Sequence, residues 1–227
     1  MGPARKSRIP DEETNCNTAV HEAGHTLVCF YTKEATPLHK VTIISRGASL
    51  GHTAFIPDKE NYSFTKSQML AQMDVAMGGR VAEELMFGSD KVTSGASNDL
   101  KGATEVATNM VKFMGMSEKV GVRTFHNTPD ATDISSTCSE AVDSEIRRLL
   151  QESYERAKNI LKTHQNELKL LADALLKYET LDAEDVRRVI EGKEPRVSVH
   201  RKHLLEIGGH ERLPRLPKPH TPHPFKL

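Results

Sequence analysis

The chain has 227 residues, and its 31 lysines and arginines balance its 31 aspartates and glutamates. A neutral chain with 5% aromatic residues and no tryptophan lacks the basic surface and stacking side chains typical of nucleic-acid-binding proteins, so we expect no nucleic-acid partner. No apolar run is long enough to span a membrane, and three cysteines without a Cys-x-x-Cys pair argue against a disulfide framework or a cysteine-based zinc site.

The first elements are predicted to be a helix and a hairpin. Residues 1–13 are polar, contain two prolines, and are expected to be a linker or the tail of something upstream. The first helix should begin among the capping residues of 14–17 and end near Lys33. Two strand-like segments, 39–44 and 51–56, are separated by a turn with a glycine, which predicts a β-hairpin.

Two further helices are predicted next. A helix that begins with a capping box at Thr65 should run to Phe87 and stop at the following glycine. A loop should cover 89–98, and a helix should then run from Asp99 to about residue 114.

A long apolar stripe follows a polar loop over 121–136. Thr137 and Glu140 form a predicted capping box, and apolar residues behind it recur at steps of three and four as far as Leu175. This spacing predicts one long helix, or two helices in line, that packs against other helices or another subunit. Asp182 should cap a short final helix that ends near residue 191.

Residues 193–227 are rich in proline and histidine and are predicted to be a disordered tail. The compact domain should therefore cover residues 14–192. Its predicted fold class is mainly α with a small β-hairpin or sheet (α+β).

The most informative motif is His21-Glu22-Ala23-Gly24-His25, inside the first predicted helix. Histidines four residues apart lie on one helix face, about 5–6 Å apart at Cβ, where two imidazoles can hold a zinc ion. Glu22 is rotated by about 100° from His21, so its carboxylate can take a proton from water that the zinc acidifies. This is the His-Glu-x-x-His pattern of zinc metalloproteases.

The alternative to a zinc site is a pair of surface histidines. Against it, apolar residues flank the motif and indicate a buried helix, in which two histidines require partners. Ala23 and Gly24 are small, which would allow close packing around a metal. We therefore favour a catalytic zinc site.

A catalytic zinc has three protein ligands and one open position, so a third ligand must come from elsewhere. The candidates are His52, Glu83, Glu84, Asp90 and Asp99, and spacing alone does not choose among them. Asp99 could equally be a plain helix N-cap.

Four blocks of sequence occur in an order that resembles one known family. They are the zinc motif at 21–25, MGGRVAEE at 77–84, TSGASND at 93–99 and GMSEK at 115–119. Together they resemble the protease domain of the FtsH-type membrane-anchored AAA zinc metalloproteases, peptidase family M41. The resemblance covers about residues 1–192, and the segment from Leu150 to Asp182 is most similar to the mitochondrial inner-membrane i-AAA branch.

The resemblance implies a role for each site residue. It implies His21, His25 and Asp99 as the ligands of one Zn²⁺ per chain and Glu22 as the general base. It makes Glu83 a candidate to bond the other nitrogen of a ligand histidine.

The resemblance also implies a setting. The family consists of ATP-dependent proteases of protein quality control, which degrade unfolded or misassembled membrane and membrane-associated proteins. It implies a homohexamer at the mitochondrial inner membrane, with the protease domain facing the intermembrane space.

Two family features are missing from this sequence. There is no Gly-x-x-x-x-Gly-Lys-Ser/Thr loop for ATP and no transmembrane segment, and both lie upstream in the family. We therefore expect ATP to bind only to a full-length protein, and the membrane anchor to lie in absent upstream segments. The simplest interpretation that the resemblance implies is an excised protease domain, with residues 1–13 as the linker from the absent upstream ATPase module.

Two alternatives stay open at this point. The free edge of the hairpin could bind an extended substrate peptide as an added strand, or the hairpin could be purely structural. For the whole chain, the alternative to an endopeptidase is a helical oligomerisation or adaptor module with an inactive or structural metal site.

Overall fold

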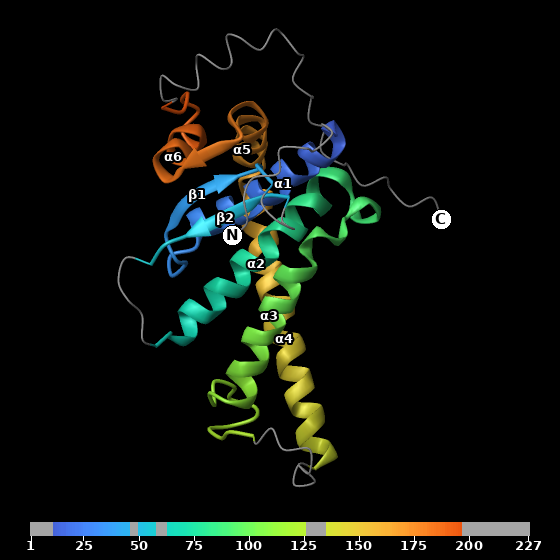
Figure 1. The fold of residues 1–227 in the computed structure, drawn as a ribbon. Coiled ribbons are helices and arrows are strands. Elements are labelled where there is room, and N and C mark those ends of the chain that lie inside the picture. The colour runs from blue at the N-terminus through green and yellow to red at the C-terminus, as the bar shows by residue number, and fades with distance from the viewer. Residues whose placement is uncertain (1–10, 46–49, 58–62, 126–134, 197–227) are drawn as a thin grey trace.

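The computed structural model describes residues 11–45, 50–57, 63–125 and 135–196. It is mainly helical with one small antiparallel sheet, as predicted (Figure 1). The predicted linker and tail lie almost wholly outside the described residues, as does most of the predicted loop over 121–136. The elements are, in chain order, α1 (Glu12–Tyr31), β1 (Leu38–Thr42), β2 (His52–Phe55), α2 (Lys66–Phe87), η1 (Ser89–Lys91), η2 (Ser94–Ala96), α3 (Ser97–Lys112), α4 (Ser136–Thr163), α5 (Gln165–Tyr178), β3 (Thr180–Asp182) and α6 (Ala183–Ile190).

Helix α1 begins earlier than predicted. Asp11 is its N-cap, and the carboxylate of Asp11 accepts hydrogen bonds from the N–H of Glu13 (3.2 Å) and from the hydroxyl of Thr14. Thr14, one of the predicted caps, therefore lies inside the helix and binds the true cap. Glu12 and Glu13 add negative charge to the first turn, which the helix dipole favours.

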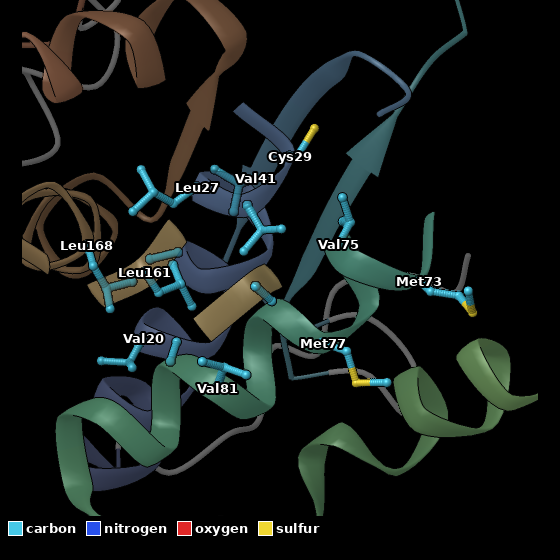
Figure 2. Packing of buried hydrophobic residues seen from close by; sticks show 14 of the residues in the cluster. Val20, Leu27, Cys29, Val41, Met73, Val75, Met77, Val81, Leu161 and Leu168 are labelled. Carbon is cyan, nitrogen blue, oxygen red and sulfur yellow. The ribbon is translucent and has the colours of Figure 1, made fainter. Parts of the chain in front are cut away.

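Helix α1 lies in the centre of the core, as its apolar flanks predicted. It packs against both α2 and α5. Val20 and Leu27 of α1, Val81 of α2 and Leu168 of α5 are all fully buried (Figure 2). The zinc motif is thus carried by a helix that the core holds on more than one side.

Helices α1 and α2 touch at two glycines. A Cβ atom at Gly24 would lie 2.4 Å from the carbonyl oxygen of Gly78, and one at Gly78 would lie 2.7 Å from the carbonyl oxygen of Gly24. Only hydrogen fits at either position. The small size of Gly24 therefore serves close contact between the two helices.

Helix α2 has both predicted ends. Thr65 and Gln68 form a capping box at its start. Gly88 ends it with φ at 91°, a conformation that side chains other than hydrogen rarely adopt.

The sheet has the order β2-β1-β3 and is antiparallel throughout. The hairpin of β1 and β2 is as predicted, whereas β3 was missed. It has only three residues, too few for a visible alternation, and it follows α5 directly. Leu181 of β3 lies opposite Val41 of β1, and both side chains are fully buried.

The apolar stripe forms two helices in line, α4 and α5, which meet at His164. His164 is half-buried and stacks on Tyr31 of α1, with ring centroids 3.6 Å apart. The predicted capping box at Thr137 is wrong, because α4 begins two residues earlier, where the hydroxyl of Ser135 accepts the N–H of Cys138 (3.2 Å). The final helix, α6, has its predicted N-cap at Asp182.

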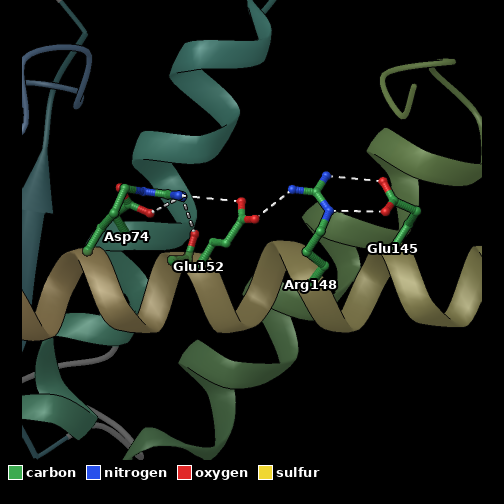
Figure 3. A network of polar contacts seen from close by, with 6 residues as sticks. Asp74, Glu145, Arg148 and Glu152 are labelled. Atoms are coloured by element: carbon green, nitrogen blue, oxygen red, sulfur yellow. Dashed lines mark hydrogen bonds and ion pairs between the residues drawn. The ribbon is translucent and has the colours of Figure 1, made fainter. Parts of the chain in front are cut away.

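A ladder of ion pairs runs along α4 and joins it to α2 at Asp74 (Figure 3). Arg156 of α4 donates two hydrogen bonds of 2.8 Å to Asp74 of α2, whose side chain is buried. Arg148 binds both Glu145 (3.0 Å) and Glu152 (2.7 Å) further along α4. Asp74 directly precedes Val75, so the Arg156–Asp74 pair ties α4 to the turn of α2 whose Val75 carbonyl contacts His25.

None of the helices in the described ranges is both long enough and apolar enough to cross a membrane.

Candidate metal centre and active site

The two histidines of the motif and Asp99 converge on one point. The Nε2 atoms of His21 and His25 are 3.0 Å apart. Oδ2 of Asp99, in the first turn of α3, lies 3.3 Å from Nε2 of His21 and 3.5 Å from Nε2 of His25. Among the residues that the structure describes, no other three His, Cys, Asp or Glu side chains form such a group.

The outer nitrogens of both rings are held by acceptors. Nδ1 of His21 lies 2.7 Å from Oε1 of Glu83, and Nδ1 of His25 lies 2.7 Å from the carbonyl oxygen of Val75. Because a carboxylate and a carbonyl can only accept, each ring carries a proton on Nδ1 and, when neutral, presents a bare Nε2 to the shared point.

This arrangement of donor atoms fits a cation. Two nitrogen lone pairs and a carboxylate oxygen that face one another at 3.0–3.5 Å repel unless a positive charge lies between them. Imidazole nitrogen and carboxylate oxygen are also ligands that zinc prefers, and outer acceptors such as Glu83 are typical of its ligand histidines. The residues present therefore fit Zn²⁺.

The surroundings of the three side chains favour positive charge at this point. Burial lowers the pKa of His21, but hydrogen bonds to Asp99 and Glu83 outweigh it and raise this pKa to about 10. Burial raises the pKa of Asp99, yet its bonds to His21 and His25 dominate and hold the pKa well below its usual range. The same negative field that retains a proton on His21 would attract a metal cation.

Glu83 joins three segments of the site and is 1% exposed. While Oε1 faces His21, Oε2 accepts the backbone N–H of Thr93 at 2.6 Å. Burial raises the pKa of Glu83, and its bonds to His21 and Thr93 lower it below the ordinary value, so the carboxyl stays ionised. Glu83 thereby fixes the segment from Thr93 through η2 that leads to Asp99.

Glu22 lies beside His21 on α1 and is 7% exposed. Its Oε2 atom accepts a hydrogen bond of 2.6 Å from the hydroxyl of Thr53 on β2. A cleft of about 970 Å³ opens over the site. The cleft is lined by Glu22 and the three converging side chains. Its lining also includes His52 and the apolar side chains of Leu50 and Phe55. A carboxylate and a candidate metal centre therefore face one cleft.

Residues 8–189 match the family model of Peptidase family M41. The chain belongs to peptidase family M41. Two of its similar relatives are the ATP-dependent zinc metalloprotease YME1 homolog of Caenorhabditis elegans, 61% identical over 200 residues, and the ATP-dependent zinc metalloprotease YME1L of Drosophila melanogaster, 60% identical over 193 residues. The human ATP-dependent zinc metalloprotease YME1L1 is 52% identical over 193 residues.

These matches cover 84–85% of this chain but only 25–28% of each relative, so the M41 chain spans about a quarter of their length. They confirm the resemblance to FtsH-type proteases and their i-AAA branch. Three of the four blocks that carried the resemblance meet at the cleft, since residues 21–25, 77–84 and 93–99 supply the converging side chains and Glu83.

The structure separates the five candidates for the third ligand of this M41 domain. Asp99 reaches the shared point, and Glu83 contacts His21 from behind. Glu84 points away and accepts the hydroxyl of Tyr154 at 2.6 Å. His52 lines the cleft outside the converging group, and Asp90 is exposed in η1.

Three contacts of the M41 site were not predicted from the sequence: those of Val75, Thr53 and Gly79. Val75 acts through its backbone carbonyl, which no residue pattern reveals. The hydroxyl of Thr53 reaches Glu22 across an interval of 31 residues. Gly79 leaves room for the ring of His21, because a Cβ atom there would lie 2.4 Å from Cε1. Gly79 belongs to the MGGR block that carried the resemblance, but only the packing shows that a glycine is needed there to leave space for His21.

Proposed function

We propose that this chain is a zinc-dependent endopeptidase domain whose ligands are His21, His25 and Asp99 and whose general base is Glu22. The main support is that the Nε2 atoms of two imidazoles and a carboxylate oxygen face one point at 3.0–3.5 Å, in a cleft that also holds Glu22. Membership of family M41 and the names of the relatives agree with this proposal.

The residues divide the work of peptide hydrolysis. Zinc bound at this point would polarise the scissile carbonyl and acidify water enough for it to lose a proton near neutral pH. Glu22 accepts that proton and then passes it to the leaving amine, so that it is ionised again at the end of the cycle. Glu83 and the carbonyl of Val75 keep both Nε2 atoms directed at the cleft.

We further propose that an extended peptide binds along β2. Among the described strands β2 is at the edge, with β1 on one side, and it lies beside the cleft. Main-chain hydrogen bonds to such an edge depend little on side chains, which suits a protease that degrades varied unfolded polypeptides.

A backbone-methylated substrate tests the edge-strand proposal. N-methylation removes one donor, and in an added strand every second amide points toward β2. We therefore expect KM for a fluorogenic peptide to rise when alternate amides are methylated and to change little when the intervening ones are. KM values without this period of two would contradict the proposal.

Substitution of the proposed base tests the mechanism. Glu22→Gln keeps the shape of the side chain but cannot accept a proton, so we expect cleavage of an unfolded substrate such as casein to fall by about 10²–10⁴-fold. Zinc content, measured on the same samples, should stay at one ion per chain. Undiminished cleavage would refute the mechanism. Wild-type chain without zinc would favour the oligomerisation or adaptor alternative.

For the full-length protein, we propose an ATP-dependent protease of the mitochondrial inner membrane that acts in protein quality control. Its protease domain would face the intermembrane space, the assembly would be a homohexamer, and upstream segments would supply the ATPase and the membrane anchor. The names of the relatives support ATP dependence and zinc. Fractionation of mitochondria with protease protection of the tagged full-length protein tests the location.

A further inference from the structure

The carboxylate of Glu22 is held from the sheet as well as from its own helix. Thr53 of β2 is 8% exposed, and its hydroxyl donates to Oε2 of Glu22 at 2.6 Å. Thr53 pairs with Val41 in the ladder, so its backbone position is fixed by the sheet. A short bond from a hydroxyl to a carboxylate is among the stronger hydrogen bonds in proteins.

The other oxygen of Glu22 meets the same segment. A Cβ atom at Gly51, the residue before β2, would lie 2.7 Å from Oε1 and 2.8 Å from Cγ of Glu22. The backbone at Gly51 therefore closes on one side of the carboxylate while Thr53 holds the other. Segment 51–53 thus confines both oxygens.

We propose that Thr53 is a positioning residue that fixes the orientation of the general base, an inference that rests on the proposed function. A glutamate side chain has three rotatable bonds, and a base must lie within hydrogen-bond reach of the proton that it takes. The bond from Thr53 selects one orientation before substrate arrives. Since we also place the substrate on β2, one strand would set the positions of both the base and the scissile peptide.

The variants T53V and T53S separate positioning from packing. Valine keeps the shape and removes the donor, so we expect kcat for a fluorogenic peptide to fall by about tenfold, the effect of losing one hydrogen bond to a charged group. KM and zinc affinity should stay at their wild-type values. T53S keeps the hydroxyl and should recover most of the lost kcat.

Thr42 offers a matched control. It is buried on the neighbouring strand, and its hydroxyl donates to the carbonyl of Glu179 at 3.0 Å, away from Glu22. T42V should therefore lower thermal stability as T53V does and leave kcat unchanged. Equal kcat in T53V and wild type, or an equal loss in T53V and T42V, would overturn the inference. If valine is not accommodated at position 53, T53A removes the same hydroxyl without adding a methyl group.

A second readout does not depend on turnover. In a double-mutant cycle of T53V with E22A, urea unfolding measures the loss of unfolding free energy in each variant. If the hydrogen bond between Thr53 and Glu22 is made, the losses in the two single variants should not add up to the loss in the double variant. Additive effects would contradict it. A zinc-loaded wild-type chain that cleaves nothing would refute the proposed function instead, and the cycle would then decide on the Thr53 contact alone.

Discussion

At the residue scale, the position of the His21 ring depends on the glycine at position 79, which has no side chain to displace the ring. A Cβ atom at Gly79 would lie 2.4 Å from Cε1 and 2.5 Å from Nε2 of His21. Contacts this short do not occur, so the ring or the helix must shift when a methyl group is added. Gly79 therefore allows the ring of His21, the first proposed ligand, to occupy its observed position.

We expect Gly79→Ala to lower zinc affinity by at least about tenfold, because it displaces a ligand ring whose outer contact with Glu83 would also be strained. Competition with a chromophoric chelator measures this affinity. Gly102→Ala is the matched control, since position 102 lies in α3 with nothing within 4 Å of the added methyl group. Equal zinc affinity in the two variants would show that Gly79 has no such role.

The sequence indicated the residues that converge at the centre, but not the neighbouring residues that hold them in place. His21, Glu22 and His25 lie within one helical turn, so local spacing alone brings them together. Asp99 comes from another helix, and only resemblance selected it from five candidates. The contacts of Thr53 and Val75 join separate elements and leave no pattern in the sequence.

At the element scale, the contact between α2 and α4 includes a second polar cluster. Glu84 of α2 accepts the hydroxyl of Tyr154 at 2.6 Å and the ammonium of Lys158 at 3.0 Å. Burial raises the pKa of Glu84, but these bonds outweigh it and lower the pKa below its ordinary 4.5. The ionised form of Glu84 therefore favours the folded state.

We expect Tyr154→Phe to lower the free energy of unfolding at pH 7 by about 1 kcal/mol. A depressed folded-state pKa contributes stability above the unfolded value of 4.5 and loses it as the pH falls through the folded value. The difference between wild type and Y154F should thus shrink in acid. Urea unfolding between pH 3 and 7 measures it, and in an E84Q background this pH dependence should vanish. A difference that is constant over this range would contradict the assignment.

Elements with strong local signals were predicted, and the others were not. The capping residues Thr65 and Asp182 each begin a helix where expected, because the cap is decided within four residues. At the start of α4, both Ser135 and Thr137 have a hydroxyl that could cap the helix, and the N-cap is Ser135. Strand β3 forms because it pairs with β1. This contact is long-range, and the sequence of three residues alone does not predict it.

At the scale of the whole molecule, the centre links α1 to α3 and, through Glu83 and Val75, to α2. A ligand that binds only the folded state stabilises it by mass action, by about 2.7 kcal/mol at a free concentration 100 times Kd. Zinc should therefore stabilise the arrangement of three helices and not merely fill a cleft.

We expect added zinc to raise the thermal midpoint of the wild type and of E22Q equally, relative to samples in EDTA. Asp99→Asn removes a charged ligand, so its midpoint should respond much less at the same zinc concentration. Differential scanning calorimetry measures all three. A D99N midpoint that rises as much as that of the wild type would exclude Asp99 as a ligand.

The three converging side chains and the groups described in contact with them come from residues 21–99, whereas α5, which packs against α1, begins only at Gln165. A ribosome therefore delivers all three proposed ligands well before it delivers α5, which completes the cover of α1. If the proposed ligands bind metal as soon as they are made, metal binding and closure of the core are separated in time during translation. The part of the apolar α1 surface that packs against α5 stays uncovered in the nascent chain until α5 emerges, so we expect a chaperone to bind during this interval.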